Sequence, residues 1–417
     1  MTINPEPTTA NSRQNATIDR LADLLPPVND LAVQPLLTMV SAQAVEADRS
    51  RSVAPEVIAA LKAGDAVRLA ASANIGGCEA SVLRIGHELA ALAGACTSTA
   101  WVLWNHLSVF HLFAGSLGPA YADSFRTQVL AGQTVCFGAG AGSGVRGVIE
   151  GDHVRLNGRG AFASGCRYAD WSGVAFVVTD PDGKRVEPLD LRFSVVCLDD
   201  DAIKIDPTWD GSGVRASATD DVHYTDLLVP LDRCVAWYGA NRAETLREIP
   251  VIAHRYREDW VGLSDLWLAW MGVGLVGAAL SEAAVAVTSR RSILGKKMVS
   301  HPMVQVNLGE ATTLLLAAAA TVEMGCRQVD DRIERGVIPS EAGYLRQMAL
   351  GSAALRQLSH AMDLLQRSQG GNGLREAGSF ERRYRDFQAM PMHINAHQDR
   401  VDLRLGRNLL GEAQDPF

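Results

Sequence analysis

Arg159-Gly-Ala-Phe-Ala-Ser-Gly-Cys-Arg-Tyr-Ala-Asp-Trp171 is the stretch of this sequence that decides the fold. Before it, Val154-Arg-Leu-Asn-Gly158 alternates in the manner of a half-buried strand that ends in a glycine turn. After it, Val174-Ala-Phe-Val-Val178 predicts a second strand. Small residues and one hydroxyl, Ser164, lie between the two strands, and small residues let a backbone come close to a flat ligand. The alternative is a simple bend in which Ser164 satisfies a neighbouring backbone group.

The composition is that of an ordinary soluble globular protein, with 47% hydrophobic and 21% charged residues in 417. The net charge of −8 argues against a nucleic-acid-binding surface. The seven cysteines form no C-x-x-C pair, which favours reduced cytoplasmic thiols over a disulfide framework or a zinc site. The longest apolar run, Leu266 to Leu280, has 15 residues. A membrane span needs roughly 20, so this run predicts a buried helix.

Changes in hydrophobic periodicity divide the chain into four parts. A polar leader, expected to be disordered, covers 1–15, and a helical domain covers 16–130. Strand-like segments with frequent turn pairs predict an antiparallel β barrel or sandwich over 131–240. Long apolar-faced segments then predict a helical domain over 241–417, built as a four-helix bundle. The bundle helices are expected at 261–290, 301–335, 340–369 and 393–411. The fold class is therefore α+β, and no G-x-G-x-x-G follows a strand.

This order of helices, β domain and helical bundle resembles the acyl-CoA dehydrogenase fold, in the branch formed by its two-component (group D) flavin-dependent monooxygenases. Several short motifs spread over nearly the whole chain carry the resemblance: Phe137 to Gly144, Thr208 to Ser217, Asp226 to Pro230, Arg291 to Gly295, Ser368 to Gly373, and Arg383 to Asp386. In the first motif, Gly138 and Gly144 replace acidic residues of the family pattern. The order and spacing of the motifs predict the fold.

The stretch between Arg385 and Asp399 bears on the choice between dehydrogenase and oxygenase. A dehydrogenase needs a carboxylate base beside the flavin, and this stretch contains no glutamate. It contains His393 and His397 instead, and Arg385, His393, Asp399 and Gly406 are similar to the monooxygenase pattern. An imidazole exchanges a proton near neutral pH. The alternatives for the two histidines are a solvated helix face and a metal pair, for which the spacing supplies no third ligand.

The resemblance implies three catalytic residues. His393 would deprotonate a phenol or hydrogen-bond the distal oxygen of a flavin hydroperoxide, and Ser164 would hydrogen-bond the reactive edge of the flavin. His106 would face the flavin from an N-terminal helix, where Asn105 and His106 interrupt an apolar face. His111 competes with His106 for this role, and the alternative for either is a satisfied core histidine.

Further site residues are implied by the same resemblance. The cofactor contacts are expected at Phe137, Gly138, Phe162, Ala163, Ser164, Arg215, Arg291, Gln369, Gly370 and Gly371. Substrate contacts are expected at Trp101, Trp104, His111 and His397. Arg291 would reach the flavin phosphate from a neighbouring subunit, and its alternative is a surface arginine at a helix end. No metal site is expected.

The predicted function is a two-component flavin-dependent monooxygenase. A separate reductase would supply reduced FMN or FAD, with FMN favoured, and O2 would form a flavin 4a-hydroperoxide that hydroxylates a small aromatic or phenolic substrate. The protein would be a cytoplasmic homo-oligomer, with a tetramer expected and a dimer as the alternative, without nucleic-acid or membrane partners. Three alternatives stay open: oxygenation of an amine or thioether, acyl-CoA dehydrogenation, and a scaffold that kept the fold without flavin.

Overall fold

The structure is a computed structural model that describes residues 7–138, 144–237, 248–376 and 378–413. A first group of helices precedes the sheet: α1 (Pro7–Leu24), α2 (Leu37–Ser50), α3 (Pro55–Ala63), α4 (Val82–Ala95), α5 (Thr97–Leu117) and α6 (Ala122–Leu130). Part of the expected disordered leader is helical, because α1 begins at Pro7. Helix α3 begins at Pro55, a residue that suits a first helical turn because the nitrogen of that position needs no partner.

The β domain occupies the middle of the chain. Its strands are β1 (Val135–Phe137), β2 (Val145–Glu150), β3 (His153–Ala163), β4 (Trp171–Thr179), β5 (Leu191–Cys197), β6 (Ile203–Asp206), β7 (Asp220–Pro230) and β8 (Val235–Ala236). They form one sheet in the order β6-β7-β3-β2-β4-β5-β8, with β1 paired to β4. The expectation of a purely antiparallel domain needs correction, because β1 and β2 both pair with β4 in parallel.

The C-terminal helices are α8 (Trp260–Ser289), α9 (Pro302–Glu334), α10 (Glu341–Gln369), α11 (Ser379–Ala389) and α12 (Gln398–Leu410). Each of the four expected bundle segments agrees with a helix within a few residues, except that α12 begins at Gln398 and not near 393. Helix α12 is short and packs at one end of α10, while α4 packs along α8. The body of the bundle is therefore completed by a helix from the N-terminal part of the chain.

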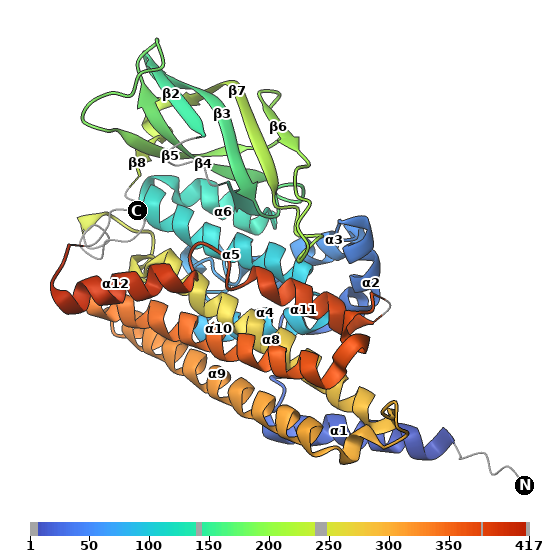
Figure 1. The fold of residues 1–417 in the computed structure, drawn as a ribbon. Coiled ribbons are helices and arrows are strands. Elements are labelled where there is room, and N and C mark those ends of the chain that lie inside the picture. The colour runs from blue at the N-terminus through green and yellow to red at the C-terminus, as the bar shows by residue number, and fades with distance from the viewer. Residues whose placement is uncertain (1–6, 139–143, 238–247, 377, 414–417) are drawn as a thin grey trace, which may run out of the picture.

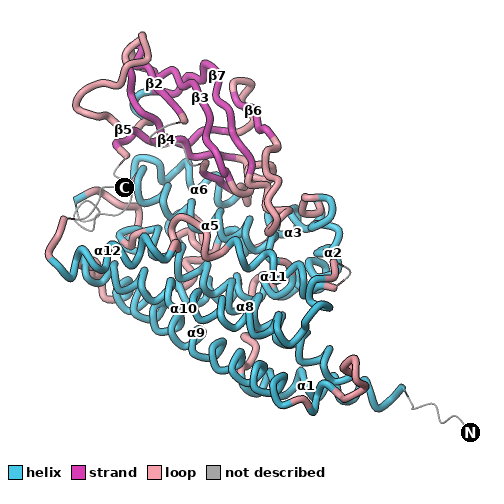
Figure 2. Tube along the Cα trace, in the orientation of Figure 1, coloured by secondary structure: helices cyan, strands magenta, loops and turns pink. Residues whose placement is uncertain are grey.

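One hydrophobic core joins the helices that precede the sheet in the sequence to the helices that follow it. Figure 1 shows the β domain standing over α5 and α6, with α8, α9 and α10 beneath, and Figure 2 shows the strands gathered in one part of the molecule. A continuous buried apolar cluster runs from Leu31 to Ala396. Helices α4 and α8 approach so closely that a Cβ on Gly274 would lie 1.9 Å from the carbonyl oxygen of Ala90. The molecule is one helical body that carries a β domain.

Helices α8 and α9 are long and apolar enough to cross a membrane by length and composition alone. Helix α8 lies at the centre of the helical body, between α4 and α10, and most of its first 20 residues are buried against them. This agrees with the prediction of a buried helix over the run Leu266 to Leu280. Its first turn is capped by Asp259, whose carboxylate accepts from the N–H groups of Val261 and Gly262.

Candidate active site

Ser164 lies where β3 ends against α5. Phe162 has a φ of +56°, and Gly165 has a φ of +80°, so the chain turns sharply on both sides of the serine. The N–H of Gly165 donates to the carbonyl oxygen of Ser217 at 2.9 Å. This turn holds the Ser164 hydroxyl 2.9 Å from Thr219 Oγ1, which in turn lies 2.6 Å from Ser217 Oγ. Three hydroxyl groups thus form a buried chain that ends at Ser164.

Helix α5 contributes an indole to the same place. Trp101 Nε1 donates to Ser164 Oγ at 3.0 Å. A serine hydroxyl has two acceptor lone pairs and one proton. If Ser217 donates to Thr219 and Thr219 to Ser164, both lone pairs of Ser164 are used and its proton remains to be donated. The arrangement therefore suits a ligand that presents a hydrogen-bond acceptor, as the edge of a flavin ring does.

His393 lies in the segment between α11 and α12 and packs edge-on against two tryptophans of α5. The centre of its ring lies 4.8 Å from that of Trp104 and 5.8 Å from that of Trp101. The N–H of Asn395 donates to His393 Nδ1 at 3.3 Å, so the neutral ring carries its proton on Nε2. Burial, and then the charge of Arg400, lower the pKa of His393 to about 4. His393 is therefore a neutral imidazole at pH 7.

Four of the predicted residues meet at this point. Trp101 joins Ser164 to His393, because its N–H bonds the serine and its ring contacts the histidine. Trp104 is almost fully buried beside them, and its N–H donates to the carbonyl oxygen of Ser264 on α8 at 3.0 Å. The sequence placed these residues on three separate segments, and the structure brings the segments together.

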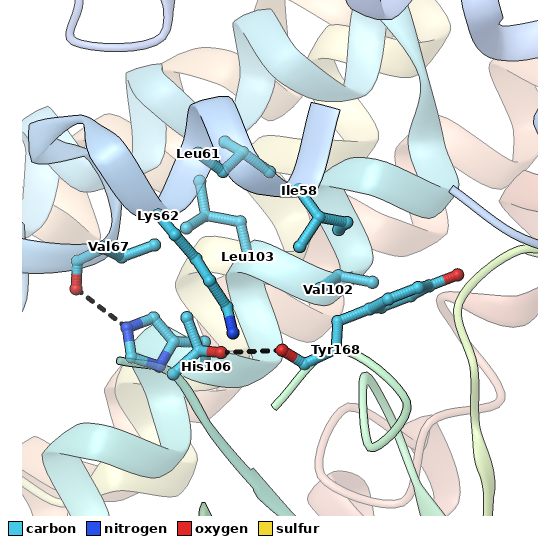
Figure 3. Close-up of a pocket in the computed structure, with 9 residues that line it drawn as sticks. Ile58, Leu61, Lys62, Val67, Val102, Leu103, His106 and Tyr168 are labelled. Atoms are coloured by element: carbon cyan, nitrogen blue, oxygen red, sulfur yellow. Dashed lines mark hydrogen bonds between the residues drawn. The ribbon is translucent and has the colours of Figure 1, made fainter. Parts of the chain in front are cut away.

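His106 requires a correction. Its Nε2 lies 2.8 Å from the carbonyl oxygen of Val67, and its Nδ1 accepts from the N–H of Val135 at 3.1 Å. Figure 3 shows the ring turned toward Val67, beside a cavity of about 20 Å³ lined by Lys62, Val102 and Tyr168. Burial lowers the pKa of His106 to about 4. Both nitrogens are engaged by main-chain groups, so His106 is a satisfied core histidine and has no nitrogen left for a ligand.

His111 is also misplaced by the prediction. It is buried on a different face of α5, where Nε2 lies 2.8 Å from the carbonyl oxygen of Glu258 and the ring contacts Tyr256. Burial lowers its pKa to about 3. His397, the other predicted substrate contact, is half-buried at the start of α12. It lines an open cleft together with Ser352 and Gln388, so it does not join the cluster around Ser164.

Some of the expected cofactor contacts surround Ser164, and others have structural roles. Phe162 is 64% exposed, while Ala163 is fully buried. The ring of Phe137 packs against Phe193 and Trp237, and a Cβ on Gly138 would lie 3.0 Å from the backbone of Gly160. Residues 139–143 of the glycine-rich loop lie outside the described residues.

Arg215 points toward α2 and not toward Ser164. Its Nη1 lies 3.6 Å from a carboxylate oxygen of Asp48, which also pairs with Arg385 at 2.9 Å. Asp386, beside Arg385, accepts the N–H of Val214 at 2.6 Å. The Arg385-Asp386 pair therefore fastens the loop around Val214 to α2 and α11, a role that the motif itself did not reveal.

A second group of predicted cofactor residues lies at the other end of the bundle, near α1 (Figure 1). The side-chain oxygen of Gln369 accepts a hydrogen bond from the guanidinium of Arg290 there. The space beside Gly370 and Gly371 is open, because a Cβ placed on either glycine would meet no atom within 4 Å. Arg291 is exposed, and its guanidinium donates to Gly295 within its own turn. One chain does not bring this group to Ser164, and the predicted role of Arg291 in a neighbouring subunit stays a prediction.

Thr219 was missed by the sequence reasoning, although Ser217 was noted. Its signal is the spacing Ser217-Ala-Thr219, which puts two hydroxyl residues close together just before β7, with Ala218 between them at a φ of +49°. Within the described parts of the chain, no three His, Cys, Asp or Glu side chains come together as a metal site.

Comparison with known proteins agrees with this fold. The model of the acyl-CoA dehydrogenase C-terminal domain matches residues 266–398. The oxygenase component of an FADH2-dependent resorcinol hydroxylase from Rhizobium is 27% identical, over 88% of this chain and 90% of its own length. The flavin-dependent monooxygenase oxygenase subunit HsaA from Rhodococcus jostii is 23% identical over 90% and 96%.

Solved structures extend the likeness to the fold. XiaF from Streptomyces, in complex with FADH2 and glycerol, superposes with a TM-score of 0.83 over 98% of both chains at 19% identity. The 3-HSA hydroxylase from Rhodococcus superposes with a TM-score of 0.80 at 21% identity, over 92% of this chain and 97% of that one. The fold is that of the acyl-CoA dehydrogenases. Over most of its length, the chain is similar to the oxygenase components of flavin-dependent monooxygenases.

Proposed function

We propose that this protein is the oxygenase component of a two-component system that hydroxylates a small phenolic or other aromatic substrate with reduced FMN or FAD and O2. The observation that carries the proposal is the meeting of Ser164, Trp101 and His393 at the junction of the β domain with α5. Relatives named as hydroxylases of resorcinol and p-hydroxyphenylacetate support the aromatic substrate. A separate flavin reductase would be the partner.

The residues around Ser164 fit a flavin. The three-hydroxyl chain leaves the proton of Ser164 free for an acceptor on the ring, and the turn at Phe162 keeps the backbone close to the site. When bound, reduced flavin supplies the electrons that activate O2. Ser164 would orient the ring, and the buried indoles would exclude water from it.

His393 would act as a hydrogen-bond donor. Its Nδ1 accepts from Asn395, so Nε2–H is the group that can face a ligand. A neutral ring with a pKa of about 4 is a weak base at pH 7. Of the two roles expected from the sequence, donation to an oxygen atom is therefore favoured over deprotonation of a phenol. The edges of Trp101 and Trp104 would form an aromatic wall for a flat substrate.

The experiment combines the full chain with FMN or FAD, reduced chemically or by a flavin reductase, and then admits O2. Phenol, resorcinol and p-hydroxyphenylacetate serve as substrates, and hydroxylated product and hydrogen peroxide are both quantified. We expect product with at least one of them and tight binding of the reduced flavin in an anaerobic titration. Binding of neither reduced flavin would refute the proposal. Reduction of bound oxidised flavin by an acyl-CoA would instead support a dehydrogenase.

The assembly is proposed to be a soluble cytoplasmic homo-oligomer, with four copies expected. The turn between α8 and α9 carries Ile293, which is fully exposed in one chain, and Leu294, which is 81% exposed. It lies at the same end as Arg291, Gly370 and Gly371. Exposed apolar side chains of this size favour an interface. Light scattering measures the mass of the assembly, and Leu294→Asp should reduce it.

A further inference from the structure

Four buried polar side chains of the helical body have atoms without any hydrogen-bond partner in the structure. They are both carboxyl oxygens of Asp265, the hydroxyls of Ser264 and Ser352, and the side-chain nitrogen of Asn395. Each of these residues is at most 4% exposed. They belong to three segments: α8, α10 and the segment that leads into α12. Buried polar groups are almost always paired in folded proteins, so a group of such atoms indicates a polar partner.

Two of these residues are joined to the candidate active site by main-chain hydrogen-bonding groups. Ser264 accepts the N–H of Trp104 through its carbonyl oxygen, and the ring of Trp104 contacts His393. Asn395 binds His393 Nδ1 through its backbone N–H. Asp265 follows Ser264 and packs against α10 at Gly351, where a Cβ on the glycine would lie 3.2 Å from Cβ of Asp265. Because Gly351 has no side chain, the main chain and Cβ of Asp265 pack directly against α10.

An open cleft reaches α10 beside the point where Asp265 packs. Ser352, beside Gly351, lines an open cleft whose other walls include Arg356, Gln388 and Met392. The hydroxyl of Ser352 is one of the unpaired atoms. The cleft therefore reaches the residue next to Gly351, against which Asp265 packs.

The charges around Asp265 come from three helices. Asp259 caps α8, and Arg400 lies on α12. Tyr344 on α10 interacts electrostatically with Asp259, Asp265 and Arg400. Burial raises the pKa of Asp265 well above its ordinary value, and the charge of Arg400 opposes this. A protonated carboxyl group accepts and donates hydrogen bonds, and it becomes a carboxylate when a cation arrives. The group thus suits a ligand hydroxyl or ammonium.

We propose that Asp265 is a specificity-determining residue that binds a hydroxyl or ammonium group of the substrate, at a position away from the carbon that is oxidised. This inference rests on the proposed function, which supplies the aromatic ring beside His393. It adds that the preferred substrates carry a second hydrogen-bonding group, and that the unpaired side chains around Asp265 receive this group.

The test measures equilibrium binding by calorimetry with the full chain and FMN. The ligands are phenol, resorcinol, hydroquinone and tyramine, which carries an ammonium group. We expect at least one ligand with a second polar group to bind about tenfold or more tightly than phenol. Asp265→Leu should bind phenol as the wild type does and lose this advantage. Asp265→Asn should keep the preference for a second hydroxyl and lose that for ammonium.

Met271→Leu is the matched control, because Met271 is fully buried and apolar on the same helix. It should leave every affinity unchanged, and thermal unfolding verifies that each variant folds. A wild type without any preference, or a preference that survives in Asp265→Leu, overturns the inference. Because binding is measured without turnover, an Asp265-dependent preference without any oxygenated product would refute the proposed function and leave the recognition role standing.

Discussion

The indole N–H of Trp101 donates a hydrogen bond to Ser164 Oγ at 3.0 Å, and so links helix α5 to the end of strand β3. The two residues are 63 positions apart in the sequence. The bond joins the face of α5 that carries Trp101 to the β domain. It also uses one lone pair of the serine and so determines which hydrogen bonds Ser164 can still make.

Replacing Trp101 by phenylalanine tests this bond. Trp101→Phe keeps an aromatic ring beside His393 and removes the donor, so the Ser164 hydroxyl loses its orientation. We expect the fraction of consumed O2 that appears in product to fall about tenfold, the size of one buried hydrogen bond. Product and hydrogen peroxide are measured together. Trp104→Phe is the control. It should lower the unfolding free energy by about 1 kcal/mol, and it should change the fraction of consumed O2 that appears in product less than Trp101→Phe does.

Removing the imidazole of His393 should separate flavin binding from oxygen transfer. In His393→Ala we expect unchanged affinity for reduced flavin and about a 100-fold loss of product, the usual scale for one positioned proton donor. Hydrogen peroxide should rise in proportion. His397→Ala should behave as the wild type, since His397 lines a separate cleft. An unchanged product yield in His393→Ala would exclude the role proposed for this residue.

The buried His106 should make the protein sensitive to acid. Its pKa is lowered from 6.5 to about 4 in the folded state, so the unfolded chain binds the proton first as the pH falls. The stability that the neutral ring contributes is present above pH 6.5 and is lost as the pH falls toward 4. The loss is at most roughly 3 kcal/mol.

His106→Gln removes this titration. Urea unfolding of both proteins between pH 7 and pH 4.5 measures the difference in unfolding free energy. We expect the advantage of the wild type to shrink steadily as the pH falls. A difference that is independent of pH would mean that His106 is accessible to protons in the folded protein.

Asp386 should be a stability residue. It is buried and accepts the N–H of Val214, a residue with a φ of +43°. Asp386→Ala would leave this N–H unpaired and lower the unfolding free energy by about 2 kcal/mol. Asp386→Asn keeps an acceptor and should lose less. Thermal and urea unfolding measure both variants, and equal stability of the alanine variant and the wild type would contradict the assignment.

Much of the fold could be predicted because the helical periodicity is strong. The segments 261–290, 301–335 and 340–369 agree with α8, α9 and α10 within one or two residues. The strand pairings were harder to predict, since alternation locates a strand without naming its neighbour. The parallel pairing of β2 with β4 is therefore a result of the structure alone. The same holds for α4, which takes the place beside α8 that was expected for a later helix.

The sequence by itself determined the class of the protein, the order of its three parts, and the placing of Ser164, Trp101 and His393 on segments that the fold brings together. Only the tertiary structure showed that His393 keeps a ring N–H for a ligand and that His106 does not, because a local pattern cannot tell which distant carbonyl or N–H meets a ring nitrogen. His106 meets Val67 and Val135 and is fully satisfied, while His393 keeps one N–H. Hydrogen-bond partners at long sequence separation, which periodicity does not encode, made that difference.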